Sequence, residues 1–260
     1  MLNYDFINLK AKEAKIDSIT IAREYWQLLF LQRLYLMNGC EKIYFKGGTA
    51  IRFLLHSFRF SEDLDFTTIG KKAETENLLK SVFSFFIKKG SVDLEFKKEK
   101  VLQKFEEESI KYRFLFKPAG LSQKTSIRID ISLREKPLTK EQTVIVPFDY
   151  PISPYPLVVH LKIEEIMAEK IRALFIRGKP RDLFDLWFLL TKKISLDKEL
   201  INKKFKIYPK LIFNMKKLEN IVYNYNEKEI KTDLNQFLPI NYREFYKKIK
   251  NETLLLLKKE

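Results

Sequence analysis

The sequence has very few residues of the types that usually bind zinc or form disulfides: one cysteine, Cys40, and two histidines, His56 and His160. A single thiol forms no internal disulfide and cannot supply a zinc site built from several cysteines. Two histidines without companion ligands argue against a zinc centre as well. We interpret all three as structural residues, and the low cysteine content is typical of the reducing cytoplasm.

Long apolar runs are also missing. The first ten residues, MLNYDFINLK, carry charged and polar side chains where an export signal needs an apolar stretch. No later segment approaches the run of about 18 apolar residues that a membrane-spanning helix requires. We therefore expect a cytoplasmic protein without a membrane partner.

Acidic residues are in the minority: 34 Asp and Glu oppose 49 Lys and Arg, which gives a formal net charge of +15. Such an excess attracts polyanions, and nucleic acid is the foremost example. A genome with a biased composition would produce the same excess without any partner. Composition by itself leaves both explanations open.

The first half of the chain mixes helical spacing with strand-like alternation. Helices are predicted at 19–37 and 73–89, with a further helix after the glycine pair at 47–48. Strands are predicted at 42–45, 63–69, 92–97, 111–117, 125–134 and 143–147. This half is expected to be α+β around a mixed sheet.

A proline-rich stretch, PFDYPISPYP, separates this half from the second. Repeated prolines interrupt both helices and sheet ladders. Helical spacing follows at 162–177, 180–192, 197–205, 210–224, 226–237 and 242–258. We predict a catalytic α+β domain at residues 1–150 and a helical domain at 151–260 that completes the active-site cleft.

Only seven glycines occur, yet Gly47 and Gly48 are adjacent, between an expected strand and an expected helix. Glycine allows the backbone to approach an anion, and the amides at a helix N-terminus point toward it. Thr49 can cap this helix and adds a hydroxyl donor. Arg52 could reach a phosphate or could face solvent. The pattern suggests an NTP-binding loop, and an ordinary tight turn fits the glycine pair equally well.

Two aspartates follow in RFSEDLDF, residues 59–66. Alternate residues of a strand share a face, so Asp63 and Asp65 point one way while Leu64 and Phe66 point into the core. Adjacent carboxylates favour a cation, and Mg²⁺ or Mn²⁺ prefers oxygen ligands. Two such ions clamp the attacking and leaving oxygens in nucleotidyl transfer. We predict a metal site here; the alternative is a polar loop whose acids face water.

A third carboxylate, Asp130, lies in the expected strand 125–134. The isoleucines at 127, 129 and 131 define a buried face, which places Arg128 and Asp130 together on the other face. Asp130 could complete the metal site or act as a general base toward the acceptor hydroxyl. The alternative is a structural pair between Arg128 and Asp130.

Lys170 lies within the apolar stripe of the helix predicted at 162–177, four residues from both Ile166 and Leu174. A lysine in this position either extends its amine out of the interface or projects into a cleft between the domains and meets a triphosphate. In the next helix, Asp185 could orient Lys170 or the nucleotide. A plain interhelical ion pair is the alternative.

Four blocks of the sequence together resemble the AbiEii/AbiGii-type nucleotidyltransferase toxins. They are KGGTAIR (46–52), RFSEDLDF (59–66), EKIRA (169–173) and RDLFDL (181–186). The resemblance extends over residues 20–192 and implies a polymerase-β-like fold and a toxin of a toxin–antitoxin or phage-defence system. It also implies, as in some members, nucleotide addition to tRNA 3′ ends.

Individual residues of this sequence match the motif positions of the family. Gly47, Gly48 and Thr49 match the glycine motif, Asp63 and Asp65 match the metal-binding aspartates, and Lys170 and Asp185 match the later lysine and aspartate. The segment after about residue 200 matches no pattern of the family.

We therefore expect an Mg²⁺- or Mn²⁺-dependent transferase that passes NMP from an NTP to RNA, at the tRNA 3′ end, with release of pyrophosphate. A cognate antitoxin is its expected protein partner. A small molecule or a protein hydroxyl is the alternative acceptor, and a non-catalytic module that binds nucleic acid or antitoxin is the alternative of another class. The expected catalytic residues are Asp63, Asp65, Asp130, Lys170 and Asp185.

Overall fold

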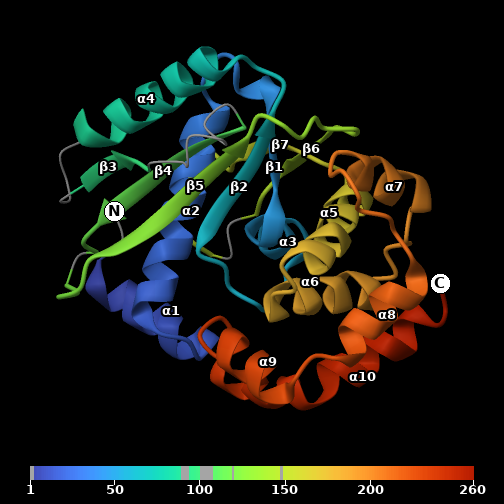
Figure 1. The fold of residues 1–260 in the computed structure, drawn as a ribbon. Coiled ribbons are helices and arrows are strands. Elements are labelled where there is room, and N and C mark those ends of the chain that lie inside the picture. The colour runs from blue at the N-terminus through green and yellow to red at the C-terminus, as the bar shows by residue number, and fades with distance from the viewer. Residues whose placement is uncertain (1–2, 89–93, 100–107, 119, 147–148) are drawn as a thin grey trace. The chain divides into compact units, whose positions relative to one another are not determined.

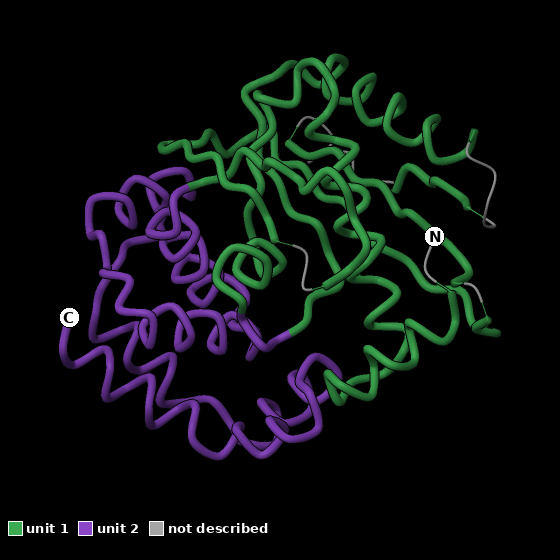
Figure 2. The backbone as a smooth tube through the Cα atoms, turned by 180° about the vertical axis from the view of Figure 1, so that it is seen from behind, with its two compact units in different colours: residues 1–56, 60–161 green, residues 57–59, 162–260 purple. Residues whose placement is uncertain are grey.

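A computed structural model describes residues 3–88, 94–99, 108–118, 120–146 and 149–260. The chain forms two compact units, one of residues 1–56 and 60–161 and one of residues 57–59 and 162–260 (Figure 2). The boundary predicted after residue 150 therefore lies too early, because a strand of the first unit follows the prolines. Residues 57–59 belong to the second unit although the first unit surrounds them in the sequence.

The first unit contains a mixed sheet, as predicted. In the part of the chain that the structure describes, the sheet has seven strands in the order β3-β4-β5-β2-β1-β7-β6 (Figure 1). At its centre, β2 pairs antiparallel with β1 and parallel with β5. The strands are β1 (Ile43–Lys46), β2 (Asp63–Thr68), β3 (Leu94–Lys98), β4 (Ser109–Phe116), β5 (Thr125–Ser132), β6 (Glu141–Val144) and β7 (Leu157–His160).

The predicted strands at 63–69, 111–117 and 125–134 match β2, β4 and β5 closely, because buried and partly exposed residues alternate through all of β4 and β5 and through the first four residues of β2. The predictions at 92–97 and 143–147 extend in part outside the described residues. β7 was not predicted: it has four residues, follows prolines, and owes its place to parallel pairing with β1.

One face of the sheet is covered by α2 (Ser18–Tyr35) and α4 (Lys72–Lys88). Asp17 caps α2 by accepting a 2.8 Å hydrogen bond from the Thr20 amide. On this face Trp26 packs on Phe114, with ring centroids 5.3 Å apart, and on Phe86 of α4 at 5.8 Å. The opposite face of β2 and β5 is left for polar side chains.

Two further helices complete the first unit. α3 (Gly47–Leu55) follows β1 directly, as the glycine pair predicts. α1 (Tyr4–Ala14) was not predicted, because it buries only Ile7 and Ala11 and so has little periodic apolar signal.

The second unit is helical, as predicted. Its helices are α5 (Ile163–Ile176), α6 (Pro180–Thr191), α7 (Lys198–Lys206), α8 (Met215–Tyr223), α9 (Glu227–Leu234) and α10 (Tyr246–Leu257). Side chains cap three of them: Asp197 accepts from Leu200 and Asn214 from Lys217, while Asn226 accepts from Lys228. The cap at Asn214 explains why α8 begins later than the predicted residue 210.

Residues 57–59 join the second unit through aromatic packing. The Phe58 ring stacks on Tyr242 with centroids 4.3 Å apart and meets Phe184 edge-on at 5.1 Å. None of the helices in the described parts of the chain combines the length and the apolar character needed to cross a membrane.

Candidate active site

The two aspartates of β2 lie on the same face of the sheet. Asp63 and Asp65 are half-buried, whereas Leu64 and Phe66 between and after them are fully buried. The alternation of a pleated strand produces this pattern, because successive side chains point to opposite faces. Two carboxylates therefore line one partly solvated surface, as the sequence predicts.

The glycine turn lies directly against one of these carboxylates. Lys46 is the register partner of Asp65, and Gly47 continues from it with a φ of 82°. A Cβ at Gly47 would lie 2.8 Å from the Cβ of Asp65 and 2.9 Å from its Cγ. Glycine is required here both for the left-handed backbone and for the close approach.

The same turn starts α3. Lys46 is the N-cap and makes no side-chain hydrogen bond to the first-turn amides. The amides at a helix N-terminus favour an anion nearby. The Asp65 side chain thus lies directly against the first turn of α3.

Asp130 lies beside Asp65 on the neighbouring strand. β2 and β5 run parallel, and their register pairs Asp65 with Asp130 and Asp63 with Arg128. The Asp130 carboxylate pairs with Lys111 of β4 at 2.9 Å. Arg128 lies 3.9 Å from the Asp63 carboxylate. The alternative pair of Arg128 with Asp130 is thus replaced by these two cross-strand contacts, because adjacent strands place the charges opposite each other.

Thr49 has a different position from the one predicted. It lies inside α3 rather than at its cap, is 1% exposed, and its hydroxyl donates to the carbonyl of Asp63. The contact ties the first turn of α3 to the start of β2. In this geometry the hydroxyl proton holds the aspartate strand and is not offered to a phosphate.

Arg52 neither faces solvent nor points to an open anion site. Its Nε and Nη2 lie 3.1 and 3.3 Å from the two carboxylate oxygens of Glu24, and its guanidinium stacks over the Phe60 ring at 4.1 Å. Glu24 is 3% exposed, and burial raises the pKa of its carboxyl although Arg52 opposes the shift. Arg52 therefore joins α3 to α2, and its proposed contact with NTP would require it to leave Glu24.

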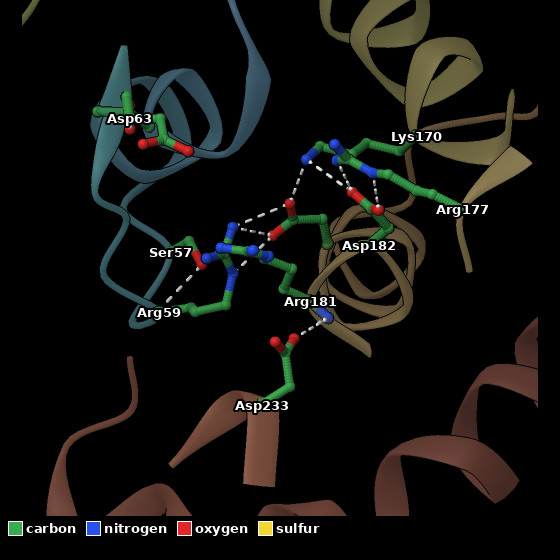
Figure 3. Close-up of polar contacts among 10 residues, drawn as sticks. Ser57, Arg59, Asp63, Lys170, Arg177, Arg181, Asp182 and Asp233 are labelled. Carbon is green, nitrogen blue, oxygen red and sulfur yellow. Dashed lines mark hydrogen bonds and ion pairs between the residues drawn. The ribbon is translucent and has the colours of Figure 1, made fainter. Parts of the chain in front are cut away.

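In the second unit, Lys170 contacts two aspartates of α6. Its Nζ lies 2.7 Å from Asp185 Oδ2 and 3.2 Å from Asp182 Oδ1. Figure 3 shows Lys170 and Arg177 both reaching Asp182, and Arg177 Nε lies 2.8 Å from it. Asp185 accepts a bidentate pair from Arg59, with both Nη2 contacts within 2.9 Å. Asp185 and Lys170 thus form an ion pair between α5 and α6, a contact that fits both the orienting role and the plain interhelical ion pair that the sequence left open.

The groups of this network are buried except for Arg177, whose side chain is 51% exposed, and its cations outnumber its carboxylates. Three cations, Arg59, Lys170 and Arg177, surround two carboxylates, Asp182 and Asp185. Burial by itself lowers the pKa of Lys170, but the Asp185 and Asp182 carboxylates outweigh it and leave the pKa raised. Burial raises the pKa of Asp182, yet Lys170 and Arg177 bring it down to about 2. Lys170 and Asp182 therefore both stay charged at neutral pH.

His160 and Cys40 are interpreted as structural residues. His160 Nε2 lies 2.8 Å from the Thr143 hydroxyl and its Nδ1 lies 2.7 Å from the Leu161 carbonyl. Burial lowers the pKa of His160. The imidazole joins β6 to the end of β7, which is a structural role. Cys40 is the single free thiol, and burial raises its pKa.

The carboxylates of β2 and β5 can be compared with the number of protein ligands that a metal ion needs. Within the described residues, no group of three or more His, Cys, Asp or Glu is arranged to hold one ion. Mg²⁺ commonly takes one or two protein carboxylates, and waters and substrate phosphates complete its shell. Asp63 and Asp65 fit that requirement. Asp130 fits it once its carboxylate separates from Lys111.

Two solved structures share this fold. The JHP933 protein of Helicobacter pylori is 23% identical, with 94% of each chain covered and a TM-score of 0.58. A candidate nucleotidyltransferase of H. pylori is 24% identical, with 90% of this chain and 94% of that chain covered and a TM-score of 0.57. The chain therefore shares the fold of these two proteins. No curated protein sequence matches the chain.

The family profile described as nucleotidyl transferase AbiEii toxin, type IV toxin–antitoxin system, matches residues 29–255. The chain belongs to this family. The match confirms the resemblance seen in the four sequence blocks. It also reaches residue 255, within α10, and so includes the segment after about residue 200, in which no family pattern was recognised. Membership implies a nucleotide substrate and an antitoxin partner.

Sequence reasoning missed three cations of these clusters: Arg59, Lys111 and Arg177. Arg59 stands at the start of the RFSEDLDF block, and its partner Asp185 is 126 positions away. Lys111 is aligned with Asp130 only through the antiparallel register of β4 and β5. Arg59, four residues before the aspartate strand, was a signal that could have been weighed, whereas Lys111 and Arg177 had none.

Proposed function

We propose that this protein transfers NMP from an NTP to an RNA hydroxyl, with the tRNA 3′ end as acceptor, in an Mg²⁺- or Mn²⁺-dependent reaction. The observation that carries the proposal is the approach of Gly47 to Asp65 at the start of α3, with Asp63 on the same face of β2. Family membership supports the nucleotidyl chemistry.

The proposed step is an in-line displacement. The acceptor oxygen forms a bond to the α-phosphorus, the bond from that phosphorus to the bridging oxygen breaks, and pyrophosphate leaves with the electron pair. The acceptor hydroxyl loses its proton, and Asp130 is the proposed base. Bound metal would stabilise the charge that develops on the attacking and leaving oxygens.

The residues of this chain hold the reactants in place. Asp63 and Asp65 are the proposed metal ligands, and Asp130 is the alternative third ligand. The backbone of Gly47 and Gly48 and the first-turn amides of α3 would bind phosphate oxygens. Positioning of this kind supplies much of the catalysis in phosphoryl transfer.

Three further residues have proposed roles that require them to change partners. Lys170 would contact the triphosphate with its amine and would give up part of its present contact with Asp182 and Asp185. Asp185 would orient the lysine. Thr49 and Arg52 would contact NTP only after releasing Asp63 and Glu24, so their share in binding is expected to be small.

An RNA acceptor is favoured by charge. A protein of net charge +15 binds a phosphate backbone through counterion release, whereas a small acceptor needs no such field. A terminal ribose hydroxyl is the nucleophile implied by the tRNA-modifying members that this sequence resembles. Addition there would block aminoacylation, which accounts for toxicity.

The test supplies each labelled NTP separately with total RNA and Mg²⁺, and resolves the products by size. A matched reaction uses RNA pretreated with periodate, which destroys the terminal diol. Label in tRNA-sized bands that periodate removes is the expected result. Label on protein or on a small molecule would overturn the RNA acceptor, and no incorporation from any NTP would overturn the transferase activity.

A further inference from the structure

Lysines gather on the solvent face of α7. Ile201, Lys204 and Phe205 are buried, and Lys204 pairs with Glu165 and Glu169 in the interior at 2.6 and 2.8 Å. The exposed positions recur at helical spacing on the other side, so they form one face of the helix. These exposed residues are Lys198, Glu199, Asn202, Lys203 and Lys206.

α8 repeats the arrangement. Leu218 and Val222 are buried against the unit. Lys216, Lys217, Asn220 and Tyr223 are exposed, and Lys210 is exposed between the two helices. The basic face, as we call the exposed side of residues 198–223, therefore extends over two consecutive helices and their connection.

Acidic residues are nearly excluded from this region. Residues 198–223 contain seven lysines and two acids, Glu199 and Glu219. In residues 226–237 of the same unit, two lysines meet three acids. A biased composition would raise lysine in both segments and would not remove acids from one of them. The charge of the basic face therefore has a local cause.

The basic face also offers an aromatic ring. Tyr223 is 65% exposed, and Lys250 of α10 lies over its ring with Nζ 5.4 Å from the centroid. Exposed rings beside cations provide stacking platforms for unpaired bases. Lysine is a point charge on a flexible stem, suited to phosphates at varied positions. A row of lysines with a stacking ring matches a nucleic-acid strand better than a folded acidic protein.

We infer that the basic face on α7 and α8 binds the phosphate backbone of the RNA acceptor. The inference rests on the proposed function for its RNA. It assigns to the exposed side of the helical unit the task of holding the acceptor, independent of base sequence, while the residues of the first unit, together with Lys170 and Asp185, act on the NTP. Backbone contacts fix position and carry no sequence information.

The test compares two triple variants of equal charge change. One carries Lys198→Glu, Lys206→Glu and Lys216→Glu on the basic face. The control carries Lys80→Glu, Lys88→Glu and Lys228→Glu, which are exposed lysines of α4 and α9. A Gln version of each triple guards against misfolding, and circular dichroism checks the fold.

Binding of fluorescent tRNA is measured by anisotropy over a range of salt concentrations. We expect the basic-face triple to raise Kd at least about tenfold, and its plot of log affinity against log salt to become shallower by about 0.7–0.9 per lost contact. The control should change Kd less than about twofold. For transfer to tRNA, KM should rise with kcat nearly unchanged.

Equal losses in both triples, or unchanged affinity in the basic-face triple, would overturn the inference. Displacement of RNA by poly-glutamate at equal charge concentration would overturn the RNA assignment and favour an acidic protein. If the wild type binds tRNA through the basic face but incorporates no nucleotide, the proposed function fails while the binding face stands. If the basic-face triple transfers nucleotide to tRNA at the wild-type rate, the binding face fails while the proposed function stands.

Discussion

Arg59 and Asp185, 126 positions apart in the sequence, form a buried bidentate ion pair with Nε–Oδ1 and Nη2–Oδ2 distances of 2.9 Å. Arg59 is 2% exposed and Asp185 is 1% exposed. The same aspartate contacts Lys170 at 2.7 Å. The segment that precedes the aspartate strand is therefore anchored to the network that holds the lysine.

Removing one partner of this pair should be costly. Arg59→Met or Asp185→Leu leaves a buried charge without its partner, and we expect the free energy of unfolding to fall by about 3–5 kcal/mol for either. The double variant should lose much less than the sum of the two. Urea denaturation measures all three, and strictly additive losses would contradict a direct interaction.

Gly47→Ala should abolish transfer and destabilise the fold by more than about 1 kcal/mol, because its backbone is left-handed and its Cβ would collide with Asp65. Gly39→Ala is the matched control. Gly39 has a φ of 92°, but a Cβ there meets nothing within 4 Å. The control should lose stability and keep its kcat; equal activity in both variants would contradict the site assignment.

Asp63→Asn and Asp65→Asn should each reduce transfer at least about a hundredfold, because they remove the proposed metal ligands. Thermal stability should change little, since both side chains are partly solvated. Asp149→Asn, at a carboxylate 89% exposed, is the control and should behave as wild type. Near wild-type turnover of either test variant, measured with labelled NTP, would remove the metal assignment.

A comparison with Lys204 tests whether Lys170 has a role in NTP binding beyond a purely structural one. Both are buried and paired with two carboxylates. Lys170→Met and Lys204→Met should both lower stability, since each strands buried carboxylates. At a temperature where both remain folded, only Lys170→Met should raise the KM for NTP. Equal NTP kinetics in the two variants would favour a structural Lys170.

Low pH should reduce the stability of the second unit, because Asp182 becomes protonated. Its pKa is about 2 in the fold, below the ordinary 3.8, so its charge stabilises the fold above pH 4. That contribution, roughly 2 kcal/mol, is lost as the pH falls from about 4 through about 2. The Asp182→Asn variant should be less stable than wild type at pH 6, and its free energy of unfolding should change less between pH 4 and pH 2. Urea titrations at successive pH values check this, and parallel curves for the two proteins would contradict it.

Local pattern determined much of the architecture from the sequence. Alternation in β2, β4 and β5 reflects the pleat of a strand, and the helices of the second unit reflect a 3.6-residue period. The face shared by Asp63 and Asp65, and the turn at Gly47 before α3, follow from the same short-range geometry. Neighbouring residues suffice to set such features.

The partners of the charged residues were decided by the tertiary structure. Arg52 meets Glu24, Asp130 meets Lys111, and Asp185 meets Arg59 because strand order, register and helix packing bring them together. The placement of residues 57–59 in the helical unit belongs to the same category. A charged side chain is held by whichever opposite charge shares its desolvated environment, and no local period in the sequence encodes that choice.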